Sequence, residues 1–230
     1  MIEVSAGIVY DREGRILICQ RGEGRKNAHL WEFPGGKIEA GESPCDCLKR
    51  GLLDVQLCYF KADQDKGTLT EVAPNDRSQL MIPAVYRDDY GWETVPVRLN
   101  GEVYPLFDRE KVSGVVDKFV SVRNAGEETA YFRVAFAIEK TDVVQRLMHF
   151  TFSGDTEAYE ISGWKDVKID GRDYQMIVYS YKEALEKGQV SPPMLLQAVM
   201  QKEATSQDLA GLRSDFLQVK VMSIQADVFK

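Results

Sequence analysis

Residues 31–44 read Trp-Glu-Phe-Pro-Gly-Gly-Lys-Ile-Glu-Ala-Gly-Glu-Ser-Pro, and this stretch organises the rest of the chain. Its first three residues, 31–33, have the character of a β-strand. The pair Gly35 and Gly36 follows, and glycine permits backbone angles that other residues resist. The sequence therefore predicts a strand that runs into a glycine turn.

An acidic loop and a helix start follow this turn. Glu39 and Glu42 bring two carboxylates into a short segment, and Ser43 with Pro44 is typical of a helix entrance. Ser43 is the expected N-cap and Pro44 the expected first helical residue. A loop that displays carbonyls and carboxylates beside a helix suits a hard cation such as Mg²⁺, which prefers oxygen ligands.

The spacing resembles the Nudix box of the Nudix hydrolases. That box begins at a glycine, has a glutamate six positions later and, after seven residues, continues Arg-Glu-apolar-any-Glu-Glu. Gly36, Glu42 and Arg50 fall on this frame. Upstream, residues 5–10 and 15–21 are similar to the branch that hydrolyses oxidised guanine nucleoside triphosphates. The resemblance covers residues 2–50, about a fifth of the chain.

The resemblance implies a fold and a domain plan. The expected class is α+β, a Nudix-type α/β/α sandwich with a mixed sheet, enlarged by a β-rich insertion or extension because a minimal Nudix domain is shorter than this chain. We expect a Nudix-like domain over residues 1–203 with an insertion at about 60–125, and a C-terminal extension at 204–230. The alternative is a second small β-rich domain from about residue 80.

The resemblance also implies a metal site. Glu42, Arg50 and Asp54 are the expected catalytic residues. The Gly35 carbonyl, Glu42 and Asp54 are the expected ligands of Mg²⁺ or Mn²⁺. In the family, such metal ions bridge a diphosphate, whose negative charge must be neutralised before phosphorus can be attacked.

Two further residues are expected at the nucleotide pocket by the same resemblance. Arg21 matches an arginine at that pocket, with a solvated strand end as the alternative. Phe33 matches an aromatic residue there, with core packing as the alternative. The resemblance therefore predicts a nucleotide-like small molecule as the partner.

The box departs from the family pattern where the chemistry lies. Gly51 and Val55 stand where the family has glutamates, and Asp54 is a shortened third carboxylate. A glycine inside the expected helix destabilises that helix by about 1 kcal/mol relative to alanine. Arg50 then lacks the neighbour that it would orient, and an ion pair with Asp46, four residues earlier, is its alternative role.

Two functions of different class remain open. The first is a divergent Nudix-type hydrolase that acts on a nucleoside diphosphate-containing substrate with Mg²⁺. The second is a catalytically impaired Nudix-fold pseudoenzyme that serves as a nucleotide-binding or protein-interaction module. Three acids of the second half, Asp155, Glu157 and Glu160, are candidates to replace the missing ligands, with a solvated surface position as their alternative.

Composition bounds the remaining possibilities. The net charge of −7 argues against general phosphate attraction, so we expect no nucleic-acid partner. The sequence has no run of eighteen apolar residues, so we expect no membrane partner and a cytoplasmic location. The four cysteines have neither disulfide nor zinc spacing and are expected to be reduced thiols. The sequence leaves the oligomeric state open.

Local patterns predict secondary structure beyond the box. Asn100-Gly101, between two alternating runs, predicts a hairpin with a type I′ turn. Ser191-Pro192-Pro193 predicts the start of a helix over residues 194–202. Other expectations are a helix at 44–56, strands at 55–60, 79–86 and 217–224, a hairpin formed by 115–123 and 129–139, and helical structure at 202–215.

Overall fold

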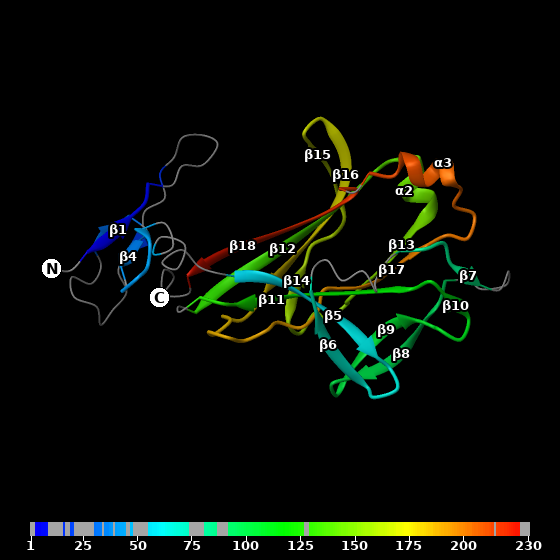
Figure 1. Ribbon diagram of the computed structural model, residues 1–230, viewed down its shortest axis with the longest axis horizontal. Helices are drawn as coiled ribbons and strands as arrows, with labels where there is room; N and C mark the ends of the chain where they lie inside the picture. Colours follow the sequence, from blue (N-terminus) through cyan, green and yellow to red (C-terminus); the bar gives the residue numbers. More distant parts are fainter. Residues whose placement is uncertain are drawn as a thin grey trace.

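The structure is a computed structural model. It describes residues 3–8, 16, 19–20, 30–33, 35–38, 40–44, 47, 55–73, 81–86, 92–126, 129–213 and 215–225. The described residues up to 47 form short paired segments, and those from 55 onward form a larger β-rich part (Figure 1). Each part is described in turn, beginning with the β-rich part.

The first sheet of the β-rich part has five antiparallel strands in the order β13-β17-β11-β5-β6. The strands are β5 (Val55–Asp63), β6 (Thr68–Val72), β11 (Val116–Asn124), β13 (Met148–Phe152) and β17 (Leu195–Met200). The expected strand from residue 55 is confirmed, and it is longer than the sequence indicates.

The second sheet has the order β14-β16-β12-β18, and one further strand, β15, also pairs with β16. All of these pairs are antiparallel. The strands are β12 (Ala130–Glu139), β14 (Tyr159–Ile161), β15 (Lys165–Ile169), β16 (Arg172–Tyr181) and β18 (Leu217–Gln225). The expected strand at 217–224 is confirmed as β18.

One hydrophobic core joins the two sheets. Val120 and Val122 of the first sheet share a buried cluster with Phe132, Val134 and Phe136 of the second. Side chains alternate between the faces of a strand, so these residues define the inner faces. The arrangement is a β-sandwich, in which burial of two apolar faces is the main stabilising term.

The predicted hairpin over Asn100-Gly101 is confirmed. β8 (Thr94–Leu99) pairs with β9 (Glu102–Phe107), and the φ angles of Asn100 and Gly101 are 50° and 91°. Two successive positive φ angles match the type I′ turn that Asn-Gly favours. The hairpin packs against the outer face of the first sheet, where its buried side chains meet Phe119 of β11.

Three smaller elements complete the described part. β7 (Val85–Tyr86) pairs with β10 (Val112–Ser113), so only the end of the strand expected at 79–86 is seen among the described residues. The helices α2 (Asp142–Leu147) and α3 (Ser206–Gly211) lie at the same end of the sandwich (Figure 1). Their N-caps are Thr141 and Thr205. Of the helical structure expected at 202–215, α3 is the part observed.

The helix predicted at 194–202 is wrong, because these residues form β17. All six residues of β17 are buried, since the strand lies between β11 and β13 and both of its faces are covered. A strand that is buried on both faces has no alternation, and periodicity alone cannot distinguish it from a buried helix.

The hairpin predicted from β11 to β12 is also wrong. Both strands exist, but they belong to different sheets. Asn124 is fully buried and bonds to the segment at 185–189: its side-chain amide donates to the Leu185 carbonyl at 2.8 Å, and its backbone N–H donates to the Gln189 carbonyl at 3.1 Å. The chain therefore crosses between the sheets at Asn124.

The described structure is sheet-rich with short helices and is compatible with the α+β class. The α/β/α layering and the mixed sheet are not confirmed, because all named strands among the described residues pair antiparallel. The domain division at residue 203 stays a prediction. In the structure β18 pairs with β12 over nine residues, which makes residues 217–225 part of the second sheet.

Candidate functional site

The glycine turn of the box is paired with the beginning of the chain. β1 (Val4–Ala6) and β4 (Gly35–Lys37) are antiparallel, and the Ile38 N–H donates to the Glu3 carbonyl at 3.0 Å. A Cβ on Gly35 would collide with the Ser5 carbonyl and lie 2.8 Å from the Cα of Ala6. The glycine is therefore required for the close approach of the two backbones.

The acidic loop leads from β4 into a helical turn. Gly41 has a φ of 87°, a conformation that favours glycine. The Cys47 N–H donates to the Ser43 carbonyl at 3.0 Å, as expected at the beginning of a helix, and the Ser5 hydroxyl donates to the Pro44 carbonyl at 2.9 Å. β1 thus holds both ends of the loop that contains Glu42, whose side chain is half-buried.

Of the six predicted site residues, three lie among the described residues. These are Phe33, Gly35 and Glu42. Phe33 follows β3 (Trp31–Glu32), which pairs with β2 (Cys19–Gln20). The Phe33 side chain is 42% exposed, so it is not packed in a core. The other three, Arg21, Arg50 and Asp54, lie outside the described residues.

Val55 bears directly on the metal-binding helix. It occupies a carboxylate position of the family frame, yet it is the first residue of β5 and pairs with Asn124. A residue paired in a sheet cannot also lie on a helical metal-binding face. The predicted helix at 44–56 is therefore wrong in its last two residues.

Two of the acids considered as replacement metal ligands, Asp155 and Glu160, have other roles or positions in the fold. One Asp155 carboxylate oxygen accepts hydrogen bonds from the backbone N–H groups of Glu157 and Ala158, both at 3.0 Å, so Asp155 stabilises a turn. Glu160 is an exposed residue of β14. Among the residues that the structure describes, no group of three histidine, cysteine or acidic side chains is arranged to hold a metal.

The described cysteine side chains are thiols. Cys47 and Cys58 are both free and buried. Burial raises the pKa of Cys58 to about 11, which keeps this thiol protonated at neutral pH. In the described parts of the chain, no helix is long and apolar enough to cross a membrane.

Comparison with known proteins gives a match for the first part of the chain. The family model of the NUDIX domain matches residues 1–53. An 8-oxo-dGTP diphosphatase of Haemophilus influenzae is 50% identical over 52 residues, which are 23% of this chain and 38% of that protein. A CTP pyrophosphohydrolase of Escherichia coli has the same identity and coverage. No solved structure gives a significant match.

A third relative, an 8-oxo-dGTP diphosphatase of Proteus vulgaris, is 36% identical over 62 residues, or 25% of this chain and 55% of that protein. The chain thus matches less than two-fifths of the length of the first two relatives and little more than half of the third. The predicted resemblance to the Nudix hydrolases, which rests on the box motif, is confirmed for residues 1–53.

Proposed function

We propose that this chain is a catalytically impaired Nudix-type module whose box loop binds a nucleotide-like ligand. The observation that carries the proposal is the position of Val55. A carboxylate position of the family's metal-binding helix is occupied here by an apolar residue in the sheet pair β5–β11.

The chemistry of the family explains why this position matters. Cleavage of a diphosphate needs its charge to be neutralised in the transition state, and the carboxylates of one helix face hold the metal ions that do so. Gly51 supplies no ligand, and Val55 is neither acidic nor helical. Loss of two direct metal ligands is expected to slow turnover by orders of magnitude.

Binding needs fewer ligands than catalysis. The Gly35 carbonyl, Glu42 and Asp54 are hard oxygen donors, which suit Mg²⁺ or Mn²⁺ in kind. Mg²⁺ commonly takes one or two carboxylates and completes its coordination with substrate phosphates and water. Arg21 and Phe33 would contact the nucleotide, and the exposure of the Phe33 ring is consistent with such a role.

A divergent hydrolase is the second candidate function. It is favoured by the loop itself, in which Gly35 allows the close approach of β1 and Gly41 adopts a positive φ. It is also favoured by the relatives, which are named for the hydrolysis of 8-oxo-dGTP and CTP. In this case Glu42 and Asp54 would hold the metal ion, and Arg50 would orient the acidic residues.

One experiment separates the two functions. The purified chain is incubated with Mg²⁺ or Mn²⁺ and a panel of nucleoside triphosphates, ADP-ribose and dinucleotide polyphosphates, and phosphate or pyrophosphate release is measured beside the melting temperature. A metal-dependent rise in melting temperature without turnover supports the binding module. Turnover that Asp54→Asn abolishes, and that the control Glu160→Gln retains, supports the hydrolase. If the chain shows neither turnover nor a shift, both proposals fail.

A further inference from the structure

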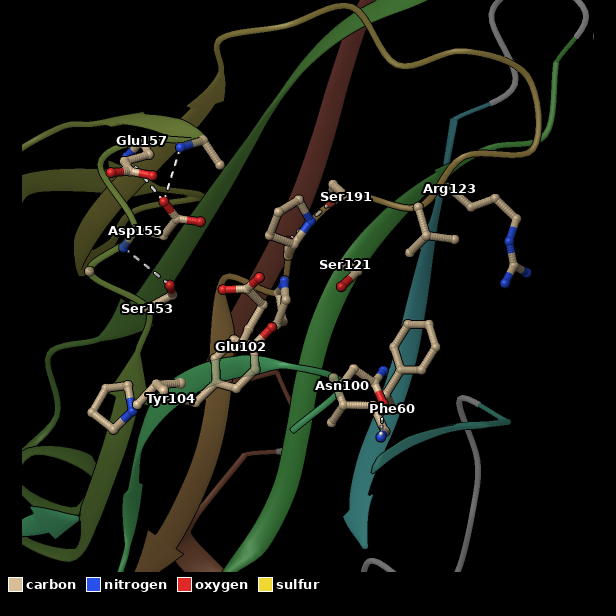
Figure 2. Close-up of a pocket in the computed structure, with 18 residues that line it drawn as sticks. Phe60, Asn100, Glu102, Tyr104, Ser121, Arg123, Ser153, Asp155, Glu157 and Ser191 are labelled. Carbon is tan, nitrogen blue, oxygen red and sulfur yellow. Dashed lines mark hydrogen bonds between the residues drawn. The ribbon is translucent and has the colours of Figure 1, made fainter. Parts of the chain in front are cut away.

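A groove opens on the outer face of the first sheet, beside the tip of the β8–β9 hairpin (Figure 2). Its volume is about 910 Å³, which is within the range of small-molecule sites. Phe60 of β5 and Ser121 and Arg123 of β11 form its floor. The walls come from the hairpin residues 100–105 and from the connecting segments 153–158 and 190–193.

Strand alternation explains the position of the groove. Val120 and Val122 point into the core between the sheets, so Phe119 and Ser121 point to the outer face. The hairpin covers Phe119, and the Tyr104 ring packs edge-on against it at 5.9 Å. The next residue on this face, Ser121, lies in the groove between the hairpin and the segment at 190–193 (Figure 2).

The groove is negatively charged. Glu102, Asp155 and Glu157 line it, and among its described lining residues the one cation is Arg123. The Arg123 guanidinium forms two hydrogen bonds with the Glu71 carboxylate, at 2.6 and 2.9 Å. This pairing lowers the pKa of Glu71 and leaves the lining carboxylates without compensation from Arg123.

Two of these carboxylates act on the same hydroxyl. Burial and the charges of Glu102 and Asp155 together raise the pKa of Tyr104, so its hydroxyl stays neutral. The Glu102 carboxylate makes no hydrogen bond or ion pair with any residue that the structure describes, although the Glu102 backbone pairs with Leu99 in the hairpin. One Asp155 oxygen is used by the turn, and the second has no hydrogen bond in the described part of the chain.

Ser121 gives an independent indication of a ligand. The residue is 2% exposed, and its hydroxyl points into the groove (Figure 2). Within the described ranges this hydroxyl has no hydrogen-bond partner. Because the hydroxyl faces the groove, it is free to donate one hydrogen bond to a ligand there and to accept another.

We propose that this groove binds an aliphatic polyamine or a related ligand with primary ammonium groups. An ammonium group has three donors and no acceptor, which complements carboxylates and hydroxyl oxygens. The Phe60 ring offers a surface for the methylene stem and for a cation–π contact. The lining charges oppose an anionic ligand, and the described lining residues include none from the proposed nucleotide loop.

The test is calorimetric titration of the full chain with spermidine at low and at physiological ionic strength. We expect saturable binding at one site that weakens as salt is added, because exposed charges are screened. Glu102→Gln is expected to weaken binding three- to fivefold, as is Ser121→Ala. Glu186→Gln, the same change at an exposed loop residue outside the groove, is the matched control and should bind as the native chain does.

Three results would overturn the proposal. The first is the absence of saturable binding at millimolar spermidine. The second is an equal loss of affinity in Glu102→Gln and Glu186→Gln, which would indicate a general charge effect. The third is tighter, salt-independent binding of a neutral oligosaccharide such as maltotriose. Melting curves of each variant establish that it is folded, and failure of the nucleotide assay does not affect these outcomes.

Discussion

Asp117 is the residue whose replacement tests the construction of the β-rich part most directly. Its carboxylate is 5% exposed and accepts hydrogen bonds from the Ala62 N–H at 2.8 Å and from the Gln197 side-chain amide at 2.9 Å. The Arg109 guanidinium lies 2.6 Å from the same carboxylate. Gln197, itself fully buried, accepts a hydrogen bond from Phe107. Asp117 therefore links β5, β9, β11 and β17.

Asp117→Ala would leave two donors without partners, the buried Gln197 amide and the partly buried Ala62 N–H. Each such donor costs about 1–3 kcal/mol, whereas Arg109 is partly exposed and can turn toward water. We expect a loss of about 3 kcal/mol in the free energy of unfolding, which corresponds to a fall of about 6–12 °C in melting temperature for a chain of this size. Asp117→Asn keeps one acceptor oxygen and should lose less.

The measurement is thermal unfolding followed by circular dichroism, with Asp173→Ala as control. Asp173 is 63% exposed and pairs with the exposed Lys168, so its replacement should move the melting temperature by about 1 °C or less. If the melting temperature of Asp117→Ala decreases by less than about 2 °C, or if it decreases equally in both variants, the reasoning that the buried network stabilises the sandwich is refuted.

Three further predictions concern the turn, an acid-sensitive ion pair and the buried thiol. Gly101→Ala forces a side chain to adopt a φ of 91° and should lower stability by about 1 kcal/mol in a denaturant titration, whereas Gly154→Ala, which meets no atom within 4 Å, should be nearly neutral. Hydrogen bonds from Arg213 and Arg172 hold the pKa of Asp215 well below its unfolded value of 3.8. This contribution to stability is therefore present above the unfolded pKa and is lost as the pH falls through the folded one. The difference in melting temperature between the native chain and Asp215→Asn should accordingly shrink as the pH is lowered below 3.8, and a difference that grows there would contradict the assignment. Because burial raises the pKa of Cys58 from 9.0 to about 11, iodoacetamide at pH 8 should modify this thiol only after unfolding; peptide mapping that finds it alkylated in the native chain would be inconsistent with its burial.

The sequence predicted features that depend on local chemistry. The Asn100-Gly101 turn was predictable because few residues other than glycine and asparagine tolerate two positive φ angles. The box loop was predictable because its spacing of glycine, glutamate and helix start is specific. β18 was predictable because its residues alternate in polarity.

Features that depend on distant parts of the chain were not predictable. The partners that cover both faces of β17 are separated from it in sequence. Its uniformly buried sequence therefore has no strand alternation and was interpreted as a helix. The crossing at Asn124 depends on hydrogen bonds to residues 185–189, some sixty positions away. The groove combines segments from residues 60 to 193, and no local pattern marks Ser121 as unpartnered. Val55 of the box lies in a strand and not in the predicted helix because it pairs with Asn124, a residue distant in sequence.

The pairing of β18 with β12 has a consequence for how the chain is made. Ala130 of β12 pairs with Gln225 of β18, which is synthesised some ninety residues later. One edge of β12 therefore stays unpaired until β18 has left the ribosome. An unpaired edge with apolar neighbours is a template for association with other chains. Synthesis that stops near residue 203 would leave this edge open permanently. We therefore expect solubility during translation to depend on β18, a strand that lies far in sequence from the Nudix box.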